Sequence, residues 1–304
     1  MAEDSAAEIR TGQHADLGDG IRLHYASAGR PGAPLMLFLH GFPEFWYAWK
    51  ALLPHYGRQH FAVAPDLRGY NLSSRPAEVE HYRIGRLIED VDRLIKALGY
   101  QDAIVVAHDW GGALAWSVAI ARPALISRLV MLNAPHPIPF ARALATDPAQ
   151  QAASQYMNWL RRPGSEDALA ADDFALMQKF LRGFSEADWL DDATLAAYKE
   201  AWGQPGAIRG GVNWYRASPL YPATDTDPGA GRLELREEDF IVPMPTLLIW
   251  GEQDQALLPV LLDGIERVVP RLRMVRIPDA THWLVHEKPE KIIAAIDDFL
   301  DDAN

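Results

Sequence analysis

Strand-like and helix-like segments alternate in the first half of this chain, and that alternation limits the folds open to it. Residues 84–98 carry apolar side chains along one helical face and are followed by Gly99, a residue typical of helix ends. Strands that alternate with helices pair in parallel through right-handed crossovers. The pattern predicts an α/β fold, with a mostly parallel central sheet flanked by helices. Four apolar strands are expected, at residues 35–39, 61–64, 103–107 and 127–132, and the continuous apolar run at 35–39 is typical of a central strand covered on both faces.

The alternation stops at residues 135–241, where we find no strand-like run. Helix-compatible segments rich in Ala, Asp, Leu and Trp fill this stretch, and Pro/Gly turns separate them. We therefore expect a helical cap of residues 135–241, inserted into a core domain of residues 1–134 and 242–304. Strand and helix signals resume after the insertion: a strand at 245–250, a helix near 260–268, a strand at 273–277 and a final helix.

Composition limits the partners of the chain. Its 304 residues are 49% apolar, which is enough for a full core. There are 29 basic and 41 acidic residues, so the net charge of −12 disfavours nucleic acid and anionic membrane surfaces. A small neutral substrate, bound by a monomer or a homodimer, is the expectation.

Cellular location is predicted from the same composition. The chain has no cysteine, which excludes disulfides and thiolate zinc sites and agrees with a reducing cytoplasm. Residues 1–10 are acidic and contain no apolar segment typical of a secretory signal. No apolar run reaches the roughly 20 residues of a membrane-spanning helix. A soluble cytoplasmic protein is therefore predicted.

Asp109 stands at the bend between an apolar strand and an apolar helix. Ala107, Gly111 and Gly112 provide small residues around it. Such a strained strand-to-helix turn presents a nucleophile at the carboxyl edge of a sheet. An aspartate is ionised at neutral pH and can attack carbon without a base to activate it. Asp109 is thus a candidate nucleophile, although an aspartate can also simply cap a helix.

Two more residues complete a triad in the chain order nucleophile, acid, base. Asp254 follows the strand at 245–250, and His282 follows the strand at 273–277. Carboxyl ends of parallel strands share one edge of the sheet, so both should lie near Asp109. Asp254 would orient the imidazole of His282 as it takes a proton from water. Asp279 competes for the acid role, while Asn133, in the other position where an acid could stand, carries no charge.

A metal site that includes His282 is a less well supported interpretation. His282 and His286 are four residues apart, but Trp283 stands where a zinc helix would have glutamate. With no thiolate or carboxylate cluster to complete a site, we expect neither metal nor cofactor. His108, beside the candidate nucleophile, is interpreted as a hydrogen-bonded structural residue.

Together, several short motifs resemble the epoxide hydrolases of the α/β-hydrolase fold. The likeness extends from residue 21 to the last helix. Two positions depart from the family pattern: Asn71 and Thr281 stand where glycine is usual. The motifs are His40-Gly41-Phe42-Pro43-Glu44-Phe45-Trp46-Tyr47-Ala48-Trp49, Arg68-Gly69-Tyr70, His108-Asp109-Trp110-Gly111-Gly112, Asn133-Ala134-Pro135-His136-Pro137 and Asn213-Trp214-Tyr215-Arg216.

The resemblance implies a two-step reaction that converts an epoxide and water to a vicinal diol. Tyr215 and Tyr156 would donate hydrogen bonds to the epoxide oxygen, with Tyr198 an alternative to Tyr156. An ester on Asp109 would then be hydrolysed, with the backbone N–H groups of Phe42 and Trp110 holding the oxyanion.

An apolar pocket lined largely by aromatic residues is expected for the substrate, although each of these side chains could equally belong to a hydrophobic core. The candidate residues are His40, Trp110, Met157, Trp159, Phe180, Phe184, Trp189 and Trp202.

Two other functions fit part of the pattern. A haloalkane dehalogenase uses the same aspartate nucleophile, but it needs two halide donors, and the Phe42 side chain cannot be one. A binding protein of this fold would hold a ligand without turning it over. The intact triad argues against that alternative.

Overall fold

An eight-stranded sheet forms the centre of the molecule in this computed structural model, which describes residues 7–183 and 189–302. The strand order is β1-β2-β4-β3-β5-β6-β7-β8. Pairing is antiparallel for β1 with β2 and for β2 with β4, and every later pair is parallel. The strands are β1 (Arg10–Gly18), β2 (Ile21–Ala28), β3 (Leu35–Leu39), β4 (Phe61–Pro65), β5 (Ala103–His108), β6 (Ile126–Leu132), β7 (Thr246–Gly251) and β8 (Leu272–Ile277).

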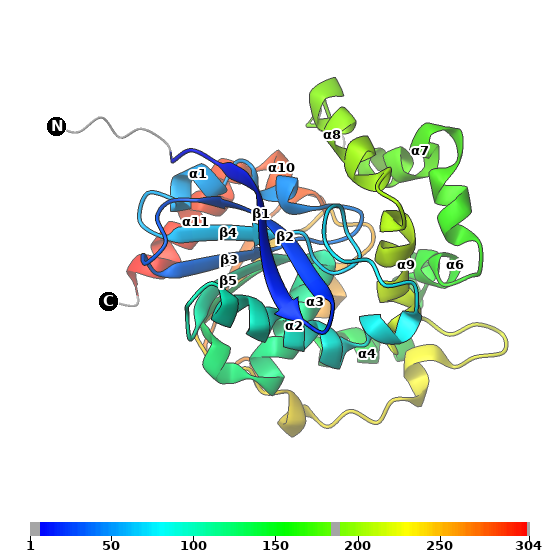
Figure 1. Ribbon diagram of the computed structural model, residues 1–304. Coiled ribbons are helices and arrows are strands. Elements are labelled where there is room, and N and C mark those ends of the chain that lie inside the picture. The colour runs from blue at the N-terminus through cyan, green and yellow to red at the C-terminus, as the bar shows by residue number, and fades with distance from the viewer. Residues whose placement is uncertain (1–6, 184–188, 303–304) are drawn as a thin grey trace.

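Helices cover both faces of this sheet (Figure 1). Successive strand residues point to opposite faces, so Leu37 packs in the core shared with α2 and α3, while Met36 and Phe38 pack in the core shared with α1 and α11. This explains why the central strands are continuously apolar. The helices are α1 (Leu53–Tyr56), α2 (Ile84–Ala97), α3 (Asp109–Ala121), α4 (Pro137–Thr146), α5 (Pro148–Ala153), α6 (Gln155–Leu160), α7 (Ser165–Gly183), α8 (Asp192–Trp202), α9 (Ala207–Ala217), α10 (Leu284–Glu287) and α11 (Pro289–Asp301).

The helices α4 to α9 all lie between β6 and β7 in the sequence. Figure 1 shows α6, α7, α8 and α9 beside the sheet layer, near the end of the sheet where α3 begins. The predicted α/β fold, with a mostly parallel central sheet flanked by helices, is confirmed. The division into a core and a cap of residues 135–241 stays a prediction. No helix of the described residues is long and apolar enough to cross a membrane.

One strand lies where the sequence analysis predicted no element, and one local prediction differs from the structure. The strand β1 pairs with β2 at the edge of the sheet, where one face can remain polar. The helix expected near residues 260–268 is instead two short 3₁₀ helices, η6 (Pro259–Leu262) and η7 (Ile265–Arg267). Gly264 separates them with a φ of 75°, a left-handed conformation that ends a helix.

Candidate active site

Asp109 sits on a strained turn between the central strand β5 and helix α3. Its φ of 49° lies in the left-handed region, which is uncommon for a residue with a side chain. Neighbouring backbone passes very close to the turn. A Cβ on Gly41 would lie 2.3 Å from Asp109 Oδ1, and a Cβ on Gly111 would lie 2.3 Å from the carbonyl oxygen of Leu39. Glycine is therefore required at both positions.

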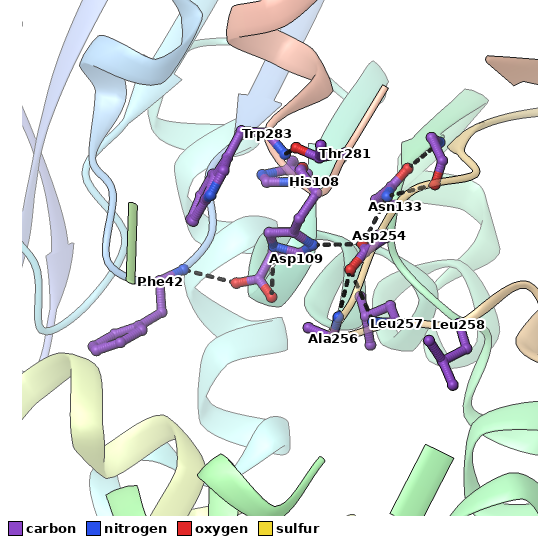
Figure 2. Close-up of polar contacts among 12 residues, drawn as sticks. Phe42, His108, Asp109, Asn133, Asp254, Ala256, Leu257, Leu258, Thr281 and Trp283 are labelled. Carbon is purple, nitrogen blue, oxygen red and sulfur yellow. Dashed lines mark hydrogen bonds and ion pairs between the residues drawn. The ribbon is translucent and has the colours of Figure 1, made fainter. Parts of the chain in front are cut away.

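Two groups contact the Asp109 carboxylate from other elements, and Figure 2 shows one of them, the backbone N–H of Phe42. The backbone N–H of Phe42, just after β3, donates to Oδ1 at 2.7 Å. Nε2 of His282 lies 3.7 Å from Oδ2. The Asp109 side chain is 12% exposed, so it remains accessible to a small molecule. The structure thus brings together Asp109, His282 and the predicted N–H of Phe42.

Asp254 holds the other side of the His282 ring. Its Oδ2 accepts from Nδ1 of His282 at 2.7 Å and from Nδ2 of Asn133 at 2.7 Å. Its Oδ1 accepts from the backbone N–H groups of Ala256 and Leu257 at 2.8 and 2.9 Å. Burial raises the pKa of Asp254, but His282 and these donors together bring it below its usual value. The buried carboxylate is therefore fully hydrogen-bonded and ionised.

The same pairing controls the charge of His282. Burial alone would lower the pKa of this imidazole, but the charge and hydrogen bond of Asp254, together with Asp109 and Glu44, raise it to about 9. The ring is accordingly cationic at neutral pH, beside the ionised Asp254.

This raised pKa predicts a loss of stability in alkali. The folded-state pKa of about 9 lies above the ordinary histidine value of 6.5, so the stabilisation is complete below pH 6.5 and disappears as the pH rises through 9. The free energy of unfolding should fall by about 3 kcal/mol over that interval. Urea unfolding at several pH values checks this, with His282→Gln as the control that lacks this component. Equal pH slopes in both proteins would contradict the prediction.

A buried glutamate supports the strands behind the triad. Glu44 Oε2 lies 3.3 Å from Nδ1 of His108, and Oε1 accepts from Nε2 of His286 at 2.6 Å and from the hydroxyl of Tyr198 at 2.7 Å. Nε2 of His108 in turn donates to the backbone oxygen of His282 at 2.8 Å. No sequence pattern predicts this network, because its members come from four distant segments. His108 has the structural role expected of it.

Two other residues considered in the sequence form their bonds outside the triad. Asp279, the competitor for the acid role, pairs with Lys288 at 2.7 Å and Lys291 at 2.9 Å on the surface. Asn71, where glycine is usual, has a φ of 39°, which asparagine tolerates, and its side chain donates to buried Asp66 at 2.9 Å.

Tyr156 on α6 and Tyr215 on α9 lie across from Asp109. Their ring centroids are 6.2 Å apart, and Tyr215 also meets the rings of Trp110 and Phe42 at 4.9 and 5.3 Å. Burial raises the pKa of both phenols, and the negative charge of Asp109 raises it further. Both hydroxyls therefore keep their protons at neutral pH. Tyr198, the alternative to Tyr156, points to Glu44 instead.

A cavity of about 520 Å³ opens from these residues. Asp109, Ala113 and Ser117 follow one face of α3 at helical spacing, which extends the cavity about 12 Å from the carboxylate. Most of the wall is apolar, and its size is typical of small-molecule sites. The other lining residues include Tyr82, Arg83, Ile84, Leu87, Trp110, Phe140, Tyr156, Met157, Trp214, Tyr215, Leu220, Leu233, Leu235, Phe240 and Leu257.

The cavity wall differs from the predicted pocket. Trp110 and Met157 line it, whereas His40, Trp159, Phe180 and Trp189 do not. His40 is buried and bonded to the backbone of Leu67 at 3.0 Å and Gly41 at 2.9 Å.

The remaining aromatic candidates pack elsewhere. Phe180 packs against the rings of Phe42 and Tyr156, at 6.3 and 6.2 Å, and Trp159 packs on the hydrophobic core. Trp189 stacks on His286 at 4.1 Å, and Trp202 donates to the backbone oxygen of Pro43 at 2.6 Å. Phe184 lies outside the described residues. The helical spacing along α3 was the one signal that could have found Ala113 and Ser117.

Metal binding has no support in the described part of the chain. It contains no group of three or more histidine or acidic side chains placed to hold a metal ion. His286, the possible partner of His282, is bonded to Glu44.

Comparison with known proteins shows the family of the chain. A family model described as alpha/beta hydrolase fold matches residues 34–289. AB hydrolase superfamily protein YfhM of Bacillus subtilis is 37% identical over 285 residues, which are 93% of this chain and 95% of that protein. Epoxide hydrolase 4 of Mus musculus is 34% identical over 289 residues, covering 92% of this chain and 77% of its own.

A solved structure is similar over the same extent. The epoxide hydrolase of Bacillus megaterium in complex with an inhibitor has a TM-score of 0.87 and 35% identity, covering 95% of this chain and 100% of that one. The chain belongs to the epoxide hydrolases of the α/β-hydrolase fold. In this epoxide hydrolase, the Asp109 carboxylate and the Tyr156 and Tyr215 phenols line one cavity, and the His282 imidazole lies 3.7 Å from that carboxylate. A mutant of the Bacillus megaterium enzyme has been solved with its product, (R)-3-[1]naphthyloxy-propane-1,2-diol.

Proposed function

We propose that the chain opens epoxides through a covalent ester on Asp109. A carboxylate oxygen attacks one ring carbon, the bond from that carbon to the ring oxygen breaks, and its electron pair stays on the oxygen. That oxygen takes a proton from Tyr156 or Tyr215. The observation that carries the proposal is the accessible Asp109 carboxylate, held between the Phe42 N–H and His282 beneath two protonated phenols.

The two tyrosines address the difficult part of ring opening. An alkoxide is a poor leaving group, so donors aimed at its oxygen reduce the cost of the developing charge. The raised pKa values of Tyr156 and Tyr215 support this role, because both hydroxyls remain available as donors at neutral pH.

The second step, hydrolysis of the ester, would use His282 and two backbone N–H groups rather than the tyrosines. Water attacks the ester carbonyl carbon while His282 takes its proton, and the Phe42 and Trp110 N–H groups stabilise the oxyanion. The contact from Phe42 N–H to Asp109 Oδ1 supports its part in this step. Collapse of the intermediate breaks the bond from the carbonyl carbon to the substrate oxygen, which takes the proton from His282 and leaves as the diol. The proton on the new Asp109 carboxyl is released and offsets the proton that the tyrosine gave up during ring opening, so that both side chains are restored.

Esterification would also prepare the base. Asp109 is one of the charges that raise the pKa of His282, and the ester is neutral. The pKa of His282 should therefore fall in the intermediate, which favours the neutral imidazole needed to accept a proton. Asp254 then stabilises the imidazolium that forms during water attack.

The substrate is proposed to be an epoxide with an apolar substituent. The apolar wall along α3 can hold an aryl or alkyl group beyond the reacting carbon. The aryloxy product of the Bacillus megaterium mutant is of this kind. A haloalkane dehalogenase is less well supported, since paired phenol donors at the cavity have no role in halide release.

The source of the product oxygen tests the covalent route. After a single turnover of styrene oxide in heavy-oxygen water, mass spectrometry should find the label in the peptide that contains Asp109. The diol from that turnover should be unlabelled, because its new oxygen comes from the carboxylate. A labelled diol with an unlabelled peptide would show direct attack by water and overturn the proposal. No diol at all would favour the binding-protein alternative.

A further inference from the structure

Two arginines in the motifs that carry the tyrosines have no role in the chemistry above. Arg161 directly follows α6, which holds Tyr156 in its first turn, and Arg216 directly follows Tyr215 near the end of α9. Each side chain reaches across to the backbone of the other helical segment. We call this pair, Arg161 and Arg216, the arginine clasp.

Arg161 binds the end of α9. Its Nη1 donates to the backbone oxygen of Tyr215, to that of Ser218 at 2.9 Å and, more weakly, to that of Arg216 at 3.4 Å. The last carbonyls of a helix have no partner within it, and a cation there also interacts favourably with the helix dipole. The guanidinium stacks over the ring of Tyr221 at 3.7 Å, which fixes its plane.

Arg216 makes the reverse connection. Its Nη2 donates to the backbone oxygen of Arg162 at 2.9 Å and to the hydroxyl of Ser165 at 3.3 Å. The same guanidinium pairs with Glu166, and this pairing is the main reason why the pKa of Glu166 is lowered. The segment after α6 is therefore held from α9, just as α9 is held from α6.

We infer that the arginine clasp fixes the distance between the Tyr156 and Tyr215 hydroxyls, which makes Arg161 a positioning residue for ring opening. Its contacts fall on the backbone of Tyr215 itself rather than elsewhere on α9. Two donors can serve one oxygen only if their spacing is constant, and a misplacement of about 1 Å can cost roughly 100-fold in rate. This inference rests on the proposed function, in which both phenols act on the epoxide oxygen.

Arg161→Gln tests the clasp, and Arg232→Gln is its matched control. Arg232 also lies over the ring of Tyr221, at 5.0 Å, but it bonds to Asp227 and the Tyr221 hydroxyl rather than to α9. Rapid-quench measurement with styrene oxide should show ester formation slowed about 10- to 100-fold in Arg161→Gln. Ester hydrolysis should stay within about twofold, and Arg232→Gln should match the wild type. Equal slowing of both steps would overturn the inference.

The double variant Arg161→Gln/Tyr215→Phe separates positioning from a general structural defect. With one hydroxyl removed, the spacing no longer matters, so Arg161→Gln should slow ester formation by at most about threefold in that background. The same loss as in the wild-type background would contradict the inference. If Arg161→Gln fails to fold, Arg216→Gln tests the other half of the arginine clasp. Its control is Arg209→Gln, which removes a cation 3.8 Å from the same Glu166.

A binding measurement keeps the clasp testable apart from turnover. The carbonyl oxygen of phenylacetamide can accept from both hydroxyls, and calorimetry should show its affinity reduced about 5- to 10-fold in Arg161→Gln and unchanged in Arg232→Gln. Unchanged affinity in Arg161→Gln would overturn the inference. If the wild type forms no ester with any epoxide but amide binding still depends on Arg161, the proposed function fails while the positioning role stands.

Discussion

The double variant Tyr156→Phe/Tyr215→Phe is expected to form the covalent ester about 10⁴-fold more slowly than the wild type. Removing one donor aimed at a developing oxyanion costs roughly 10²- to 10³-fold, and this variant leaves the epoxide oxygen with neither phenol. The single variants should each lose less, because the remaining hydroxyl can still donate. Rapid-quench mass spectrometry of the protein, after mixing with styrene oxide, measures ester formation directly.

Tyr198→Phe is the matched control for this loss. Tyr198 on α8 is also a buried tyrosine, but its hydroxyl donates to Glu44 at 2.7 Å and it does not line the cavity. Ester formation in Tyr198→Phe should stay within about fivefold of the wild type, since no donor to the epoxide oxygen is lost. A loss in Tyr198→Phe as large as that in Tyr156→Phe would contradict the assignment of Tyr156.

The variant His282→Gln is expected to stop after the first step. Asp109 needs no base for its attack, so the ester should still form, whereas water attack without the imidazole should slow about 10³- to 10⁴-fold. Steady-state turnover should fall by that factor. Intact-protein mass spectrometry should find nearly one equivalent of substrate bound, with the added mass of the whole epoxide.

Peptide mapping of the trapped protein then locates the adduct. It should fall on the peptide that contains Asp109, and Asp254→Asn should show the same accumulation to a lesser degree, because His282 remains but loses its charged partner. An unmodified His282→Gln protein that has also lost turnover would place His282 in the first step and refute the assigned order.

Much of the candidate site could be predicted from the sequence because parallel strands deliver their carboxyl ends to one edge. Asp109, Asp254 and His282 each follow an apolar strand, and they meet within hydrogen-bonding or near-contact distance. Tyr156 and Tyr215 were implied by the family resemblance, and both line the cavity. Their catalytic roles remain predictions that the variants above would test.

Local patterns were less informative where conformation depended on distant neighbours. His40 belongs to a motif of the family, yet its ring serves the backbone of Leu67 rather than the cavity. Phe180 and Trp189 are large aromatic residues of the kind that line pockets, but they pack on neighbouring rings. Side-chain type and helical spacing are the same for a wall residue and a core residue, so only the packing of segments separates them.

The sequence by itself determined the central alternation of strands and helices, the sharp turn at Asp109 and the places of Asp254 and His282 after strand ends. These follow from period, strand ends and small residues, which are local properties of the chain. Tertiary structure alone decided the cavity wall, the network around Glu44 and the cross-links made by Arg161 and Arg216. Those features join segments more than 50 residues apart, and no local pattern records which distant backbone a side chain will reach.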